Sequence, residues 1–160
     1  MTTYPPGQIP AVVDPETREI LIHRGLPDRH LTSFRPLHSL QPWDRNPRLL
    51  IFGTWGADVP MCLDPVDGAV VCAAPRQSDV YLVNSSLRAF VDSLDAMTAA
   101  APLSSRNPSY DSDAAAADRM RSVLSVIDPA ALGDLMGFWQ SIAEDIENGD
   151  YDDTPMGGSA

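Results

Sequence analysis

Lysine is absent from this 160-residue chain, and all 11 basic residues are arginine. Without lysine the chain cannot contain a phosphate-binding P-loop, whose lysine reaches the phosphates of a nucleotide. The 11 arginines are outnumbered by 22 acidic residues, which gives a formal net charge of −11. Because nucleic-acid binding depends on clustered cations, this balance argues against a nucleic-acid partner and favours a basic protein as partner.

Long apolar runs are also missing. No run approaches the ~18 residues that a membrane span needs, so we expect no membrane association. Residues 1–10 have neither the basic region nor the apolar core of a signal peptide, which favours a cytoplasmic location. Apolar residues still make up 44% of the chain, enough for one domain with a real core. We expect a single domain over residues 1–160, with an ordered core at about 11–149 and flexible ends at 1–10 and 150–160.

Cysteine and histidine are scarce. Cys62 and Cys72 are the only cysteines, and we expect them to be reduced and to behave as small hydrophobic residues. They lie on the two arms of an expected hairpin, where a three-residue turn would place them opposite each other and a two- or four-residue turn would not. His23, His30 and His38 could join them in a zinc site, but no Cys-x-x-Cys motif or close histidine pair supports one. We therefore expect no metal and no cofactor.

Catalytic signatures are missing as well. Ser85 and Ser86 have no flanking glycines and so do not form a nucleophile elbow. The stretch from Gly53 to Gly56 lacks the third glycine of a dinucleotide-binding fingerprint. We predict no catalytic residues and no enzymatic activity.

The clearest pattern that is present is a strand running into a helix. Residues 80–83 are apolar and β-prone, and Asn84 and Ser85 are residue types that cap a helix N-terminus. The following apolar residues recur at helical spacing and predict a helix over residues 85–99. These stripe residues are Leu87, Phe90, Val91, Leu94 and Met97.

The strands predict a mainly antiparallel sheet. Short apolar runs place strands near residues 49–54, 60–64, 69–73 and 80–83, and Asp67-Gly68 predicts a turn between the second and third. Sequential short strands with tight links favour an antiparallel meander. Residues 28–48 are expected to form extended segments or one edge strand.

Three further helices complete an expected α+β fold. The first covers residues 15–24, with Asp14-Pro15 at its start, Gly25 at its end, and Ile20 and Leu21 facing the core. The second covers 114–127, and the third runs from Pro129 to residue 147. Their expected inward residues are Met120, Val123, Leu124 and Ile127 in the former, and Leu132, Leu135, Met136, Trp139, Ile142 and Ile146 in the latter.

The acidic residues concentrate at the C-terminal end. Residues 1–121 hold 14 acids and 11 arginines, a net charge of −3, whereas 122–160 hold eight acids and no arginine. The excess is either a solvated face or a docking surface for a cationic partner. The candidate partner-binding residues on it are Asp134, Glu144, Asp145 and Glu147, which lie off the apolar stripe.

Trp55 is a further candidate for partner contact. It lies in a glycine-flanked loop after a strand, where packing and partner contact are both open interpretations.

The order of these elements resembles the SUKH superfamily of bacterial toxin-immunity proteins, specifically its fourth subfamily. The matching pieces extend over roughly residues 14–149, and the ordered set, with Val83 to Leu87 running into a helix, is more specific than any single piece. The pieces are Gly25-Leu26-Pro27, residues 49–53, Leu63-Asp64, Asp67-Gly68-Ala69-Val70, Val83-Asn84-Ser85-Ser86-Leu87, Phe90, Asp128-Pro129, Trp139 and residues 144–149.

The resemblance implies an α+β fold with helices packed on an antiparallel sheet. It also implies a non-enzymatic protein that binds and blocks a polymorphic toxin, often a nuclease or deaminase, and it supplies no catalytic residues to transfer. A negative net charge fits this function, since toxins that act on nucleic acid are often basic. The alternative is a general protein-interaction or regulatory module on the same fold, with no toxin partner.

Overall fold

The computed structural model describes residues 1–28, 33–73, 80–101, 103 and 110–151. His30 and residues 152–160 of the expected flexible tail at 150–160 lie outside these residues. The elements follow one another along the chain from an N-terminal helical segment, through five strands, to the helices of the C-terminal half. They are η1 (Pro6–Gln8), α1 (Pro15–Glu19), η2 (Ile20–Arg24), β1 (Phe34–Trp43), β2 (Asn46–Trp55), β3 (Val59–Leu63), β4 (Val70–Ala73), β5 (Val80–Asn84), α2 (Leu87–Ala100), α3 (Tyr110–Ile127), η3 (Pro129–Leu132) and α4 (Phe138–Glu147).

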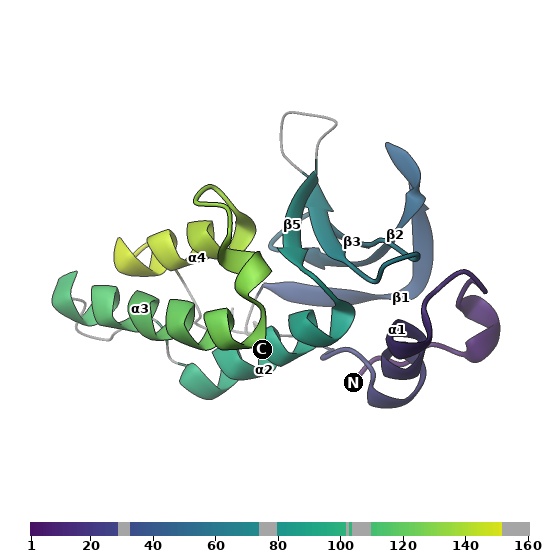
Figure 1. Ribbon diagram of the computed structural model, residues 1–160, viewed down its shortest axis with the longest axis horizontal. Helices are drawn as coiled ribbons and strands as arrows, with labels where there is room; N and C mark the ends of the chain where they lie inside the picture. Colours follow the sequence, from purple (N-terminus) through teal and green to yellow (C-terminus); the bar gives the residue numbers. More distant parts are fainter. Residues whose placement is uncertain (29–32, 74–79, 102, 104–109, 152–160) are drawn as a thin grey trace, which may run out of the picture.

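The five strands form one antiparallel sheet in the order β1-β2-β3-β4-β5 (Figure 1). Each strand pairs with its neighbour in sequence, so the predicted meander and the α+β fold are confirmed. Residues 28–48 were expected to form extended segments or one edge strand, and they contain β1, which is an edge strand of the sheet. Local apolar runs with short links dictate this topology because each strand finds its partner next along the chain.

The β3–β4 hairpin places the two cysteines out of register. Met61 lies opposite Cys72 and Cys62 lies opposite Val71, so the cysteine side chains leave opposite faces of the sheet. Asp67-Gly68 lies within the longer connection between Leu63 and Val70, and this connection is closed by a Gly68 N–H bond to the Asp64 carbonyl at 2.9 Å.

Helix α2 packs on one face of the sheet and organises the core. All five stripe residues predicted from its spacing are buried. Phe90 of α2 meets Phe34 of β1 and Phe52 of β2 with ring centroids 5.2 and 5.6 Å apart, in edge-to-face arrangements favourable for aromatic rings. α3 contacts both α2 and α4, and α4 also contacts β5, so these helices form a layer beside the sheet (Figure 1).

The first helix also forms as predicted. The Asp14 side chain accepts the Thr17 N–H at 3.0 Å, Pro15 takes the first helical position, and Gly25, with φ of 75°, ends η2. Ile20 and Leu21 are buried as expected.

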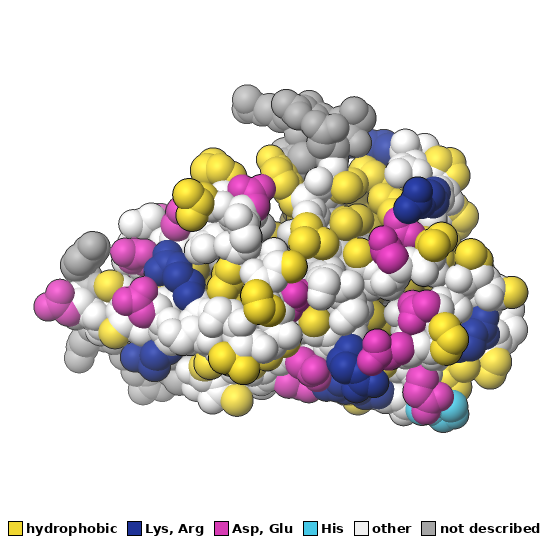
Figure 2. Space-filling view, viewed as in Figure 1, with side chains coloured by type: hydrophobic (Ala, Val, Ile, Leu, Met, Phe, Trp, Pro, Cys, Tyr) yellow, Lys and Arg dark blue, Asp and Glu magenta, His cyan; other side chains and the backbone are white. Residues whose placement is uncertain are grey.

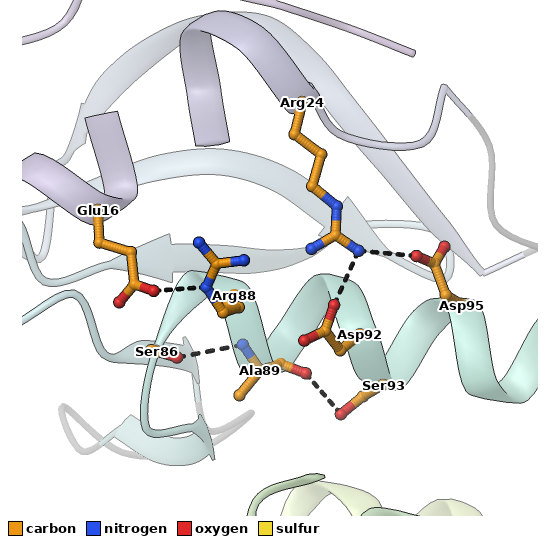
Figure 3. Close-up of polar contacts among 8 residues, drawn as sticks. All are labelled: Glu16, Arg24, Ser86, Arg88, Ala89, Asp92, Ser93 and Asp95. Carbon is orange, nitrogen blue, oxygen red and sulfur yellow. Dashed lines mark hydrogen bonds and ion pairs between the residues drawn. The ribbon is translucent and has the colours of Figure 1, made fainter. Parts of the chain in front are cut away.

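Three ion pairs, made by two arginines, attach this N-terminal segment to α2 (Figure 3). Arg88 of α2 bonds to Glu16 of α1, and Arg24 of η2 reaches Asp92 and Asp95 of α2 at 2.8 and 2.9 Å. Exposed pairs of this kind contribute at most about 1 kcal/mol each, so they orient the segment more than they stabilise it.

The N-terminus differs from the sequence expectation, which started the core near residue 11. Tyr4 and Ile9 are buried members of the main core. Thr2 forms a β-bridge with Leu26, and the Tyr4 hydroxyl donates to the Leu37 carbonyl at 2.7 Å. The proline-rich composition suggested a flexible arm. The segment is instead held in place because Tyr4 and Ile9, which adjoin the prolines, are buried in the main core.

The predicted helix over 129–147 is wrong as a continuous element. It is divided into η3 and α4 by a turn at residues 133–137, and Leu135 and Met136 are exposed rather than inward. The Asp134 side chain accepts the Met136 N–H, and Gly137 then becomes the N-cap of α4. In α3, Val123 was also expected inward, and it is 45% exposed.

Candidate partner-binding surface

Helix α2 is capped by Ser86 rather than by the predicted Asn84 or Ser85. The Ser86 hydroxyl oxygen accepts the Ala89 N–H at 3.1 Å, which satisfies one free donor of the first turn (Figure 3). The cap residue types were read correctly, but the helix begins two residues later than expected. Asn84 and Ser85 are therefore available for other contacts.

Asn84 instead holds the C-terminal helices against the end of β5. Its side chain is fully buried, its Nδ2 donates to Asp128 Oδ2 at 3.0 Å, and its Oδ1 accepts the Trp139 Nε1–H at 3.1 Å. A buried amide must be hydrogen-bonded, and here one side chain bonds Asp128, which precedes η3, Trp139 of α4 and, at 3.4 Å, the Ser93 hydroxyl of α2. We call Asn84, Asp128 and Trp139 the buried polar hub.

Asp128 completes this hub. It is buried and accepts hydrogen bonds from the Asn84 side chain and from the N–H and hydroxyl of Ser85, at 2.7 and 3.0 Å for the last two. The Asp128-Pro129 pair predicts a helix start and does not indicate these hydrogen bonds. The partners are 43 and 44 residues away in sequence, so no local pattern reveals them.

Trp55 lies against the start of α4. Its ring centroid is 5.0 Å from that of Phe138 and 5.9 Å from that of Trp139, both in near-perpendicular arrangement. Trp55 and Phe138 are half-buried, while Trp139 is fully buried. Packing, one of the two interpretations offered for Trp55, is therefore realised in the structure.

The four acidic candidates fall into two groups at the two ends of α4. Asp134 lies in the turn before the helix, whereas Glu144, Asp145 and Glu147 lie in its last turns. A ten-residue helix is about 15 Å long, so the two groups are separated by roughly that distance. The structure does not gather the four carboxylates into one cluster.

Glu147 differs from the other acids because it has a cationic partner. Arg121 of α3 reaches Glu147 at 3.0 Å, with both side chains about one-third exposed or less, and also contacts Asp118 and Gln140. Glu144 and Asp145 are exposed. Partial burial, followed by repulsion from Asp150 and Glu144, raises the pKa of Asp145. The exposed negative charge of this end therefore resides on Glu144, Asp145 and Asp150.

The described residues show little capacity for metal binding or thiol chemistry. No group of three or more His, Cys, Asp and Glu side chains among them could hold a metal ion. Burial raises the pKa of the Cys62 thiol to about 12 and that of Cys72 to about 11, so both remain protonated at neutral pH.

In the part of the chain that the structure describes, no helix is both long enough and apolar enough to cross a membrane.

An antiparallel meander with helices joined to its last strand defines the chain as an α+β protein. Comparison with known protein families identifies it further, since the family described as SUKH-4 immunity protein matches residues 1–145. The chain belongs to this family, which confirms the resemblance found in its sequence and supports a toxin-immunity role. Searches of curated proteins and of solved structures find no match.

Proposed function

We propose that this protein is a cytoplasmic, non-enzymatic immunity protein that binds a basic toxin domain and neutralises it. Membership of the SUKH-4 immunity protein family supports an immunity function. The inference that the partner is basic rests on the charge distribution, because residues 122–160 contain eight acids and no arginine. A toxin that acts on nucleic acid, such as a nuclease or deaminase, needs a cationic surface for phosphates, and an acidic protein can occupy that surface.

The acidic residues of the α4 end supply the long-range part of this interaction. Glu144 and Asp145 are exposed, and Asp134 lies at the other end of the helix. Exposed charges of one sign steer an oppositely charged protein toward them and raise the association rate. Glu147 contributes less to such steering because Arg121 already compensates its charge.

Inhibition by purified protein tests this function. Where a gene next to the one for this chain encodes a nuclease or deaminase toxin, its purified toxin domain is the probe, assayed on its own nucleic-acid substrate with increasing amounts of the full chain. We expect inhibition that saturates at a fixed molar ratio and protection of cells that express both proteins. An active toxin domain at saturating immunity protein would contradict the proposal and favour the interaction module without a toxin.

A further inference from the structure

Leu135 and Met136 are adjacent large apolar residues that the fold leaves in solvent. Their side chains are 77% and 75% exposed, in the turn between η3 and α4. Figure 2 shows hydrophobic side chains standing out over this turn, with an acidic side chain beside them. Single exposed apolar residues are ordinary in proteins. Here two adjacent apolar side chains are exposed, and neither contributes to folding the favourable free energy that its burial would give. We call these two residues the apolar tip.

The apolar tip is held in one conformation. Asp134 accepts the Met136 N–H with its side chain and the Gly137 N–H with its carbonyl, both at 2.9 Å. At Gly137 a Cβ atom would lie 2.8 Å from the Asp134 carbonyl oxygen, so the turn closes too tightly for a side chain there. A turn fixed in this way loses little conformational entropy when a partner covers it.

The apolar tip is also followed by two aromatic residues that are packed into the fold. Phe138 follows it directly and packs against Trp55, and Trp139 is bonded to Asn84 in the buried polar hub. Methionine and aromatic residues are enriched at protein interfaces, where a few apolar anchors on a rigid base carry most of the affinity.

We propose that Leu135 and Met136 form the apolar anchor of the toxin interface, an inference that rests on the proposed toxin binding. The occupant is a toxin surface with an apolar recess and a basic rim. Charge complementarity supports this partner, because Asp134 adjoins the tip and no arginine occurs from residue 122 onward. The exposed acids Glu144 and Asp145 speed encounter, and the tip prolongs the bound state.

Measurements of the association and dissociation rates of the full chain with the same toxin domain test these two separate contributions. We expect the double change Leu135→Ala and Met136→Ala to raise the dissociation rate at least about tenfold, as loss of an interface anchor does, with the association rate nearly unchanged. The melting temperature should be unaffected, because both side chains are exposed.

A matched control comes from the opposite end of the molecule. Val12 and Val66 are 58% and 61% exposed and lie near α1, where Asp14 N–H bonds to the Pro65 carbonyl. Changing both to alanine removes a smaller amount of exposed apolar surface at a site away from the tip, and we expect unchanged toxin kinetics.

The outcomes separate the two proposals. If the wild-type chain fails to bind the toxin domain, the proposed function fails and the anchor fails with it. If the wild type binds and the tip variant dissociates at the wild-type rate, the function stands and the anchor is overturned. The alternative occupant of the tip is a second copy of this chain, which light scattering would detect as a dimer. A wild-type dimer that is absent in the tip variant, with unchanged toxin kinetics, would make the tip a contact between two copies and would overturn the anchor.

Discussion

Asn84 accepts a hydrogen bond from the indole N–H of Trp139 at 3.1 Å, and both side chains are fully buried. The same amide donates to Asp128, so one residue at the end of β5 is bonded to both C-terminal helical elements. The bonds at Asn84 therefore stabilise the attachment of α4 to the sheet rather than the start of α2.

Replacing Asn84 by alanine should destabilise the protein markedly. The change leaves the buried Trp139 N–H without its acceptor and removes one of the two hydrogen bonds to Asp128 Oδ2, which keeps the Ser85 N–H. We therefore expect a loss of about 2 kcal/mol or more in the free energy of unfolding. Urea denaturation measures it. Asn46→Ala is the control, because Asn46 is exposed and bonds only locally to the Arg48 N–H. Equal midpoints for the two variants would contradict the role of the hub.

Replacing Ser86 by alanine should cost about 1 kcal/mol of unfolding free energy, as loss of an N-cap does. Ser86→Asp keeps a side-chain acceptor at the cap position and should retain most of the stability. Thermal and urea melts of the two variants give the comparison. If the two variants lose stability equally, the Ala89 N–H does not depend on this cap.

Alkaline pH should destabilise the fold through its buried thiols. The unfolded thiols ionise with a pKa near 9, whereas burial raises the folded values to about 12 for Cys62 and about 11 for Cys72. The folded state thus retains protons that the unfolded state loses, so stability is fully present below pH 9 and declines as pH rises toward 12. Burial raises the pKa of Tyr4 from 10.0 to about 12, which adds to the decline above pH 10.

The free energy of unfolding, measured in urea between pH 7 and 11, checks this dependence. The double change Cys62→Ala and Cys72→Ala should flatten the profile between pH 9 and 10, before Tyr4 contributes. A wild-type profile that stays level to pH 11 would show that these groups are solvated in the folded protein.

Neutralising the exposed acids of α4 should slow toxin association. We expect Glu144→Gln with Asp145→Asn to lower the association rate more than it raises the dissociation rate, because exposed charges act mainly on encounter. The difference from wild type should shrink with added salt, since charges are screened over ~8 Å at physiological ionic strength. Stopped-flow mixing with the toxin domain at two salt concentrations measures both effects.

The control for this experiment removes two charges elsewhere. Asp44, after β1, and Glu19, at the end of α1, are exposed and lie away from α4. Changing them to Asn and Gln gives the same net charge as the α4 variant. Equal association rates for the two variants would show that overall charge, rather than the α4 end, attracts the partner.

Much of the fold could be predicted because its information is local. Each strand pairs with the next one along the chain, and the α2 stripe from Leu87 to Met97 shows helical spacing without interruption. The first helix could likewise be placed from Asp14, Pro15 and Gly25, whose effects on the backbone act within a few residues.

The parts that could not be predicted depend on distant partners or on competition between local signals. Asn84 and Trp139 are 55 residues apart, and nothing near either residue indicates their bond. At Leu135 and Met136 the apolar spacing favoured one long helix, but the Asp134 side chain and Gly137 favoured a turn, and the turn prevails. The acidic candidates could be found by charge, but the contact between Arg121 and Glu147 needed the three-dimensional structure.

The buried polar hub cannot form until the C-terminal part of the chain has been synthesised. β5 and its Asn84 leave the ribosome well before Trp139, so until α4 has been synthesised the Asn84 oxygen lacks the indole N–H that it accepts in the finished protein. Because Asn84, Asp128 and Trp139 are bonded to one another in the folded protein, we expect β5, η3 and α4 to open and close as one unit. The apolar tip lies between residues 128 and 139, so we expect it to reach its final position together with this unit.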